Sequence, residues 1–124
     1  RRGALEHIFE GEINRNGDAV GYHYEGYPTA KGKVVEGTKL RPNRNGVYSA
    51  EVEVDGISKD SSSTFYPENF TVQEVIDLIN EAYTNKRFIG GNSYIGTTSS
   101  NLEIKMFLDR DNKIISAFPK YYRR

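Results

Sequence analysis

Two stretches of the chain alternate between hydrophobic and polar side chains with a period of two residues, which predicts half-buried β-strands. In residues 47–54 the apolar face carries Tyr48, Ala50, Val52 and Val54, and the opposite face carries Ser49, Glu51 and Glu53. In residues 102–108 the apolar face carries Leu102, Ile104, Met106 and Leu108. A turn at residues 109–112 and a last strand at 113–118 follow, which predicts antiparallel pairing near the C-terminus.

A helical period is clearest after Thr71. The hydroxyl of Thr71 and the carboxylate of Glu74 have the spacing of a capping box, in which each side chain binds the other residue's backbone N–H. The apolar stripe that follows is Val72, Val75, Ile76, Ile79 and Tyr83, and residues 84–85 end the helix. A shorter helix is expected over residues 1–10, ended by Gly11.

The remaining segments contain turn signals and short extended pieces. Asn16-Gly17 predicts a tight turn between two short strands, and Asp55-Gly56 predicts a turn into a partner strand at 57–59. We expect a loop with a brief strand at 34–35 in residues 25–46, and a polar loop at 61–64. Residues 89–101 are expected to be a loop with one short extended piece. The predicted class is α+β, with an N-terminal helix, one long helix and an antiparallel sheet.

Composition limits the kinds of chemistry available. The 124 residues fit one domain, residues 1–124, and the absence of cysteine excludes disulfides, thiolate nucleophiles and cysteine-based metal sites. The longest apolar runs are only a few residues, so no membrane span or signal peptide is predicted. The 17 basic and 17 acidic side chains balance, which argues against broad, charge-driven nucleic-acid binding. The chain begins at Arg1 rather than Met, and we expect it to be a piece of a longer protein.

The two histidines, His7 and His23, are the first candidates for chemistry. A histidine pair can act as general base and general acid near neutral pH. The alternative is that both are surface or hydrogen-bonded structural residues. His23 stands in the segment GYHYEG, whose glycines let the backbone approach a ligand closely. No cluster of ligands at metal spacing accompanies the pair, so no metal is expected.

Hydroxyl-rich and basic segments are further candidates. Residues 97–100, after Tyr94, are either a solvated loop or a set of neutral donors for a phosphate. A basic stretch, which is either a solvated loop or a track for phosphates, contains Lys31, Lys33, Lys39, Arg41 and Arg44. Some of the nine tyrosines could stack on bases, although most tyrosines are half-buried packing residues.

Seven segments in this order resemble the bacterial EndoU nuclease domain, found at the C-terminal tip of polymorphic and contact-dependent inhibition toxins. They are LEHIFEGEIN, GYHYEG, NGVYSAEVEV, STFYPENFT, VIDLINEAY, NSYIGTTSSN and KIISAFP, and they span nearly the whole chain. The resemblance implies a compact fold of the EndoU, barnase and RelE type. It also implies an endoribonuclease that leaves a 2′,3′-cyclic phosphate and needs no cofactor, although some relatives are stimulated by manganese.

The resemblance assigns roles to particular residues. The family's histidine pair corresponds to His7 and His23, with His23 as the expected base and His7 as the expected acid. Many relatives add a lysine four residues before a Ser or Thr. If that Ser/Thr is Thr98, Tyr94 stands in the lysine's place, and a cation would have to come from Lys31, Lys33 or Lys120. In the family's C-terminal base-stacking motif Ser116 and Phe118 take the corresponding places, and Tyr121 lies near them.

These implications lead to one function and two alternatives. The expectation is an antibacterial toxin that cleaves RNA, with tRNA as the favoured target, and that is silenced by a cognate immunity protein. It would be secreted or displayed on the cell surface within a large effector and act in the target-cell cytoplasm, without a membrane or DNA partner. The first alternative is a catalytically weak module of the same fold that binds RNA or protein, and the second is a DNase.

Overall fold

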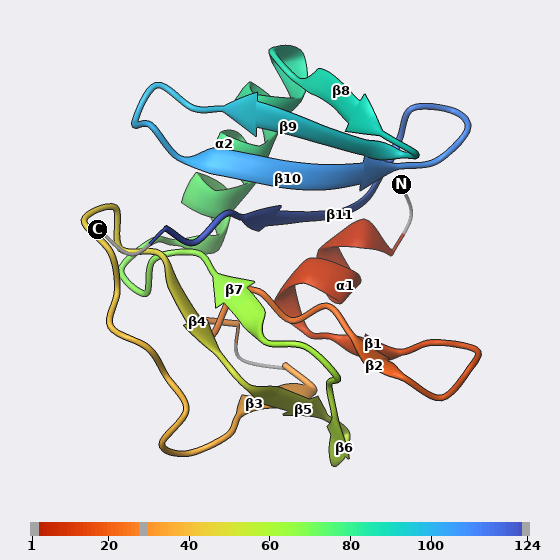
Figure 1. The fold of residues 1–124 in the computed structure, drawn as a ribbon, viewed down its shortest axis with the longest axis vertical. Helices are drawn as coiled ribbons and strands as arrows, with labels where there is room; N and C mark the ends of the chain where they lie inside the picture. The colour runs from red at the N-terminus through yellow and green to blue at the C-terminus, as the bar shows by residue number, and fades with distance from the viewer. Residues whose placement is uncertain (1–2, 28–29, 123–124) are drawn as a thin grey trace.

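The computed structural model describes residues 3–27 and 30–122, and the first two residues of the helix expected at 1–10 lie outside this part. The structure has a four-stranded sheet. In Figure 1 this sheet and helix α2 form the upper half of the molecule, and short strands form the lower half. Helix α1 (Ala4–Phe9) lies between these two groups of strands. The predicted α+β class, with one short and one long helix and antiparallel strands, is confirmed. No helix in the described ranges is long and apolar enough to cross a membrane.

The upper sheet is antiparallel in the order β11-β10-β9-β8. Its strands are β8 (Arg87–Gly90), β9 (Ser93–Thr97), β10 (Glu103–Leu108) and β11 (Ile114–Pro119). Because side chains alternate along a strand, Ile104 and Met106 are fully buried against α2 while Lys105 and Phe107 lie on the opposite face. The strands predicted at 102–108 and 113–118 are confirmed, together with their pairing.

Helix α2 (Val72–Thr84) has the predicted capping box. The backbone N–H of Glu74 donates to the Thr71 hydroxyl at 3.1 Å, and that of Thr71 donates to the Glu74 carboxylate at 2.8 Å. The helix packs Val75, Ile79 and Ala82 into the main core. A side chain at position 96 in β9 would overlap the Ala82 carbonyl, so glycine there permits close packing of the helix on the sheet.

The lower half consists of small antiparallel sheets. A hairpin pairs β1 (Glu12–Ile13) with β2 (Ala19–Val20), as expected from Asn16-Gly17. The second sheet has the order β3-β5-β6, with β3 (Gly32–Val34), β5 (Val52–Val54) and β6 (Ile57–Ser58). The third pairs β4 (Tyr48–Ala50) with β7 (Ser63–Phe65). Their side chains form a second core that includes Tyr22, Tyr48 and Phe65.

Three details of the sequence-based prediction are wrong. The strand expected at 47–54 is two strands, β4 and β5, because the chain leaves one sheet and enters another at Glu51. The polar loop expected at 61–64 contributes Ser63 and Thr64 to β7, because these residues pair with β4. The short extended piece expected within residues 89–101 is β9, but the segment also contains the end of β8 and the turn of a β8–β9 hairpin, because pairing with β10 compensates for its weak hydrophobic pattern.

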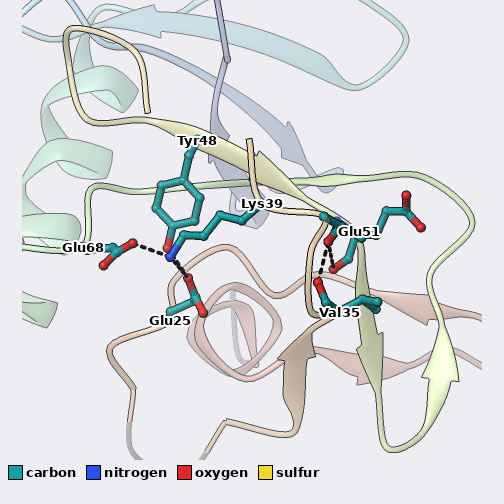
Figure 2. A network of polar contacts seen from close by, with 7 residues as sticks. Glu25, Val35, Lys39, Tyr48, Glu51 and Glu68 are labelled. Atoms are coloured by element: carbon teal, nitrogen blue, oxygen red, sulfur yellow. Dashed lines mark hydrogen bonds and ion pairs between the residues drawn. The ribbon is translucent and has the colours of Figure 1, made fainter. Parts of the chain in front are cut away.

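A polar network fastens the long loop after β3 to the small sheets (Figure 2). The hydroxyl of buried Tyr48 donates to the Glu25 carboxylate at 2.5 Å, and burial is the main reason why the pKa of Tyr48 is raised. The ammonium of Lys39 lies 3.1 Å from the Glu25 carboxylate, also binds Glu68, and sits 4.5 Å from the centre of the Tyr48 ring. Part of the basic stretch noted in the sequence is therefore held in a structural ion-pair network.

Candidate active site

A cleft of about 460 Å³ opens between the two groups of strands. Its walls come from the end of α1, the segment after β2, the segment between β6 and β7, and the strands β10 and β11. The lining side chains with polar or aromatic groups include His7, His23, Lys59, Thr64, Ser116 and Phe118. Thus both histidines and two of the other predicted site residues, Ser116 and Phe118, line one cavity.

Backbone hydrogen bonds bring the two histidine segments together. The N–H of Tyr22 donates to the His7 carbonyl at 3.0 Å, and the N–H of His23 donates to the Ile8 carbonyl at 2.7 Å. Gly21, directly before Tyr22, adopts a left-handed φ of 81°. A Cβ at position 21 would overlap the His7 carbonyl oxygen. Only glycine therefore allows the second histidine segment to lie directly against the end of α1.

The imidazole of His23 is held in one tautomer. Its Nδ1 lies 2.7 Å from the carbonyl oxygen of Thr64, and since a carbonyl only accepts, Nδ1 must carry the proton. Burial lowers the pKa of His23 well below its ordinary value, the positive charge of Lys59 and the nearby His7 lower it further, and the bond to Thr64 opposes them. The neutral ring consequently has a free lone pair on Nε2, as a general base requires.

Aromatic rings support His23 from the side of the upper sheet. The ring of Phe118 stacks on the imidazole with centroids 4.9 Å apart and an interplanar angle of 20°. Phe107 contacts Phe118 in turn, with centroids 6.0 Å apart and a tilt of 40°. Phe118 was expected to stack on a substrate base, but in this structure one face of its ring is already occupied by His23.

His7 has a different environment from His23. Its side chain is 14% exposed, and its Nδ1 lies 2.7 Å from a carboxylate oxygen of Glu12. A carboxylate orients the ring by accepting from Nδ1, and it forms an ion pair with the ring when the imidazole is protonated. The arrangement directs Nδ1 of His7 toward Glu12 and leaves Nε2 for a substrate.

Lys59 supplies a cation that the sequence analysis missed. Its ammonium donates to the Ser63 hydroxyl at 2.6 Å and to the Gly21 carbonyl at 3.2 Å, and burial lowers its pKa to about 8. An ammonium has three donors, so one remains for a ligand. The spacing from Lys59 to Ser63 is the four residues expected of the family's Lys and Ser/Thr. That spacing is the signal in the sequence that identifies Lys59, whereas the expectation above applied it to Tyr94 and Thr98.

Two hydroxyl groups of the cleft are left without a hydrogen-bond partner within the described protein. They are the side-chain oxygens of Thr64 and Ser116, and both are buried. Ser116 is only 4% exposed. Because a buried hydroxyl without a partner is unfavourable, these two oxygens are well suited to bind a polar group that enters the cleft.

Tyr94 and Thr98, expected as catalytic residues, do not line this cleft. Tyr94 lies opposite Met106 on the face of the upper sheet that packs against α2, and its ring contacts Phe88. Thr98 is buried in the turn between β9 and β10, where its hydroxyl binds Ser100 and accepts from the N–H of Leu102. Their alternation and turn position direct them away from the cavity that holds the histidines.

The remaining predicted substrate contacts also lie elsewhere. Lys31 and Lys33 are exposed residues at β3, and the backbone N–H of Lys31 binds the Glu10 carbonyl. The hydroxyl of Tyr121 donates to the Arg41 carbonyl at 2.7 Å, which fixes the C-terminal segment to the long loop. Lys120 lines a separate pocket of about 330 Å³ with Arg44. Within residues 3–27 and 30–122, no group of three or more His, Asp or Glu side chains could hold a metal ion.

Comparison with known proteins agrees with the features of this cleft. The sequence matches the profile described as "Bacterial EndoU nuclease" over residues 1–121, and the chain belongs to this family. It is 46% identical over 122 residues to a protein of Bacillus cereus described as "Toxin", a match that covers 96% of this chain. The chain spans 22% of the length of that relative. No solved structure gives a significant match.

Proposed function

We propose that this nuclease domain is a toxin endoribonuclease that cleaves RNA by attack of a ribose 2′-hydroxyl on the adjacent phosphate. The main support for the proposal is that one cleft holds two histidine rings in different environments. His23 is buried, neutral and fixed with a free Nε2, whereas His7 is partly exposed and paired with Glu12. Membership of a nuclease family supports the reaction class, and the relative described as a toxin supports the biological role.

The proposed reaction uses His23 as the base and His7 as the acid. Nε2 of His23 takes the proton of the 2′-hydroxyl while the 2′-oxygen forms a bond to phosphorus. The bond from phosphorus to the 5′-oxygen breaks, and protonated His7 gives its Nε2 proton to that departing oxygen. The products are a 2′,3′-cyclic phosphate and a free 5′-hydroxyl, with His23 left protonated and His7 left neutral.

Lys59 and the free hydroxyls would complete the site. The remaining donor of the Lys59 ammonium suits the oxygen on which negative charge grows as the phosphorus becomes five-coordinate. The hydroxyls of Ser116 and Thr64 can each donate to or accept from the polar edge of the nucleotide. In this proposal Lys59 and Thr64 replace Tyr94, Lys31 and Lys33 of the prediction from sequence, and Ser116 keeps its expected role.

The wider role is part of the same proposal. We place the domain within a large secreted or surface-displayed effector that acts in the cytoplasm of a target cell, with tRNA as the favoured substrate. The length of the toxin relative, of which this chain spans 22%, supports such a parent protein. A producer of the toxin needs a cognate immunity protein, and covering the cleft between His7 and His23 is the direct way to inhibit it.

The binding-module alternative was motivated by the apparent lack of a lysine in the site. Lys59 in the cleft removes that motive, and the tautomer of His23 favours chemistry over binding alone. The DNase alternative differs in one requirement. The proposed mechanism needs a 2′-hydroxyl at the cleaved nucleotide, whereas DNA has none.

The test is cleavage of total bacterial RNA by the purified domain in EDTA, beside a variant in which both histidines are alanine. Discrete new ends with 2′,3′-cyclic phosphate, made only by the unaltered domain, would support the mechanism and its independence of metal. A substrate with 2′-deoxyribose at the mapped position should then remain intact. Cleavage of that deoxy substrate would overturn the mechanism, and intact RNA in both EDTA and manganese would favour the binding module.

A further inference from the structure

The outer face of the upper sheet carries a row of side chains that starts in the cleft. Phe118 of β11 lies opposite Lys105 of β10, Lys105 lies opposite Ile95 of β9, and Ile95 lies opposite Arg87 of β8. Neighbouring strands are ~4.8 Å apart, so the row extends over roughly 14 Å from Phe118 to the far edge of the sheet. Figure 1 shows β8 at that edge.

This row faces away from the helix-covered core. The buried residues of β10 are Ile104 and Met106, and strand alternation puts Lys105 and Phe107 on the other face. Lys105 and Ile95 are half-buried and Arg87 is exposed, so the row is a surface open to a partner. Apart from Phe118, its members do not line the cavity that holds His7 and His23.

Contacts between side chains connect the row to the candidate active site. The ammonium of Lys105 lies 5.4 Å from the centre of the Phe107 ring, and Phe107 contacts Phe118, which stacks on His23. Side-chain contacts therefore run without a break from His23, the proposed base, to Lys105, the cation of the row nearest the cleft.

The charge of the row suits a polyanion. Its two charged members, Lys105 and Arg87, are both cations, in a protein whose total charge is zero. The acidic residue on the neighbouring row, Glu103, accepts from the hydroxyl of Tyr122 at 2.8 Å. Here Lys105 adjoins the half-buried rings of Phe107 and Phe118. Cations combined with aromatic rings are a usual means of binding single-stranded nucleic acid, and an open sheet face is a common platform for it.

We propose that the RNA strand next to the cleaved phosphate lies along this row, with Lys105 and Arg87 binding phosphates beyond the reaction centre. The inference rests on the proposed RNA-cleaving function and extends it by naming where the flanking substrate binds. It accounts for RNA recognition by a neutral protein, because two cations placed beside the cleft replace a general basic surface.

The test is a double variant, Arg87→Gln with Lys105→Gln, compared with the matched control Arg15→Gln with Lys33→Gln. The control removes one arginine and one lysine from exposed positions that do not line the cleft. Binding is measured with a single-stranded RNA that carries 2′-deoxyribose at the cleaved position, over a series of salt concentrations. Cleavage of a dinucleotide, which is too short to extend from the cleft to Arg87, is measured in parallel.

Loss of two phosphate contacts should make the slope of log affinity against log salt shallower by about 1.4 for the double variant and leave it unchanged for the control. Dinucleotide cleavage should remain at the level of the unaltered protein. An unchanged salt slope would overturn the inference. Failure of the proposed function would be distinct, since the unaltered protein would then cleave neither the dinucleotide nor RNA.

Discussion

The ring of Phe118 lies stacked on the imidazole of His23, with centroids 4.9 Å apart and 20° between the planes. On another side of the same imidazole, the Thr64 carbonyl accepts the Nδ1 proton at 2.7 Å. The two contacts fix both the plane and the tautomer of a ring that is only 4% exposed. Residues from β7 and β11, far apart in the sequence, thus hold the ring of a histidine that follows β2 in one orientation.

Replacing Phe118 by leucine should move the acidic limb of the pH–rate profile to higher pH. Loss of the ring admits water to His23, which weakens the main cause of its lowered pKa, so the base becomes protonated at a higher pH and activity below neutrality falls. Single-turnover cleavage rates across the acidic range measure the limb. Phe118→Tyr keeps the ring and should keep the original profile, and a leucine variant with an unmoved limb would contradict the supporting role.

Replacing Lys59 by glutamine should reduce kcat by about 10²–10³-fold, the usual loss when one donor to a developing anion is removed. Substrate binding should change less than kcat, because the negative charge on the phosphoryl oxygens is greatest in the transition state. Steady-state kinetics on a defined RNA separates the two effects. Lys33→Gln is the control, since this exposed lysine does not line the cleft; equal losses in both variants would contradict the role of Lys59.

His7→Ala should lower the rate on ordinary RNA by about 10²–10⁴-fold, as expected for loss of a general acid. The loss should largely disappear on a substrate whose 5′-oxygen is replaced by sulfur, because a thiolate, with a conjugate-acid pKa of about 8.5, leaves without being protonated. His23→Ala should stay inactive on both substrates, since the 2′-hydroxyl still needs a base. If the sulfur substrate rescues His23→Ala instead, the two roles are reversed.

Gly21→Ala should destabilise the protein more than Gly17→Ala. Both glycines have a left-handed φ, 81° and 85°, which costs about 1–2 kcal/mol for an L residue. A Cβ at position 17 meets open space, whereas one at position 21 would overlap the His7 carbonyl. Urea unfolding of the two variants measures the difference, and equal stabilities would show that the approach of the two histidine segments is not tight.

Protonation of His23 should also affect stability. The folded state holds its pKa below the ordinary value of about 6.5, so below that pH the unfolded chain takes up a proton that the folded protein does not. The free energy of unfolding should therefore fall as pH decreases from about 6.5 toward the folded-state pKa. His23→Asn keeps an N–H to offer to Thr64 but does not titrate there, and its stability should fall less over the same pH range.

Local signals in the sequence were sufficient for several elements. The capping box at Thr71 and Glu74 set the start of α2, and Asn16-Gly17 indicated the first hairpin. The period of two in residues 102–108 identified β10 and its buried face. These predictions succeeded because each depends on neighbouring residues or on one buried face.

Strands that form only by pairing with segments distant in the sequence could not be predicted from such local signals. Residues 47–54 divide between two sheets because β5 pairs with β3 and β4 pairs with β7. Residues 63–65 form β7 because they pair with β4. The hairpin of β8 and β9 likewise depends on β10 and on the close approach of Gly96 to α2. Strand propensity depends strongly on such surroundings, so the local pattern did not contain the answer.

The amino-acid sequence by itself determined the α+β class, the two helices, the family resemblance and the pair His7 and His23 as the candidate acid and base. Only the tertiary structure decided which side chains surround them. Lys59, Thr64 and Phe118 reach the cleft from separate strands and loops, while Tyr94 and Thr98 are directed away from it. The reason is physical: burial, the His23 tautomer and the position of the cation arise from contacts between segments that are distant in the sequence.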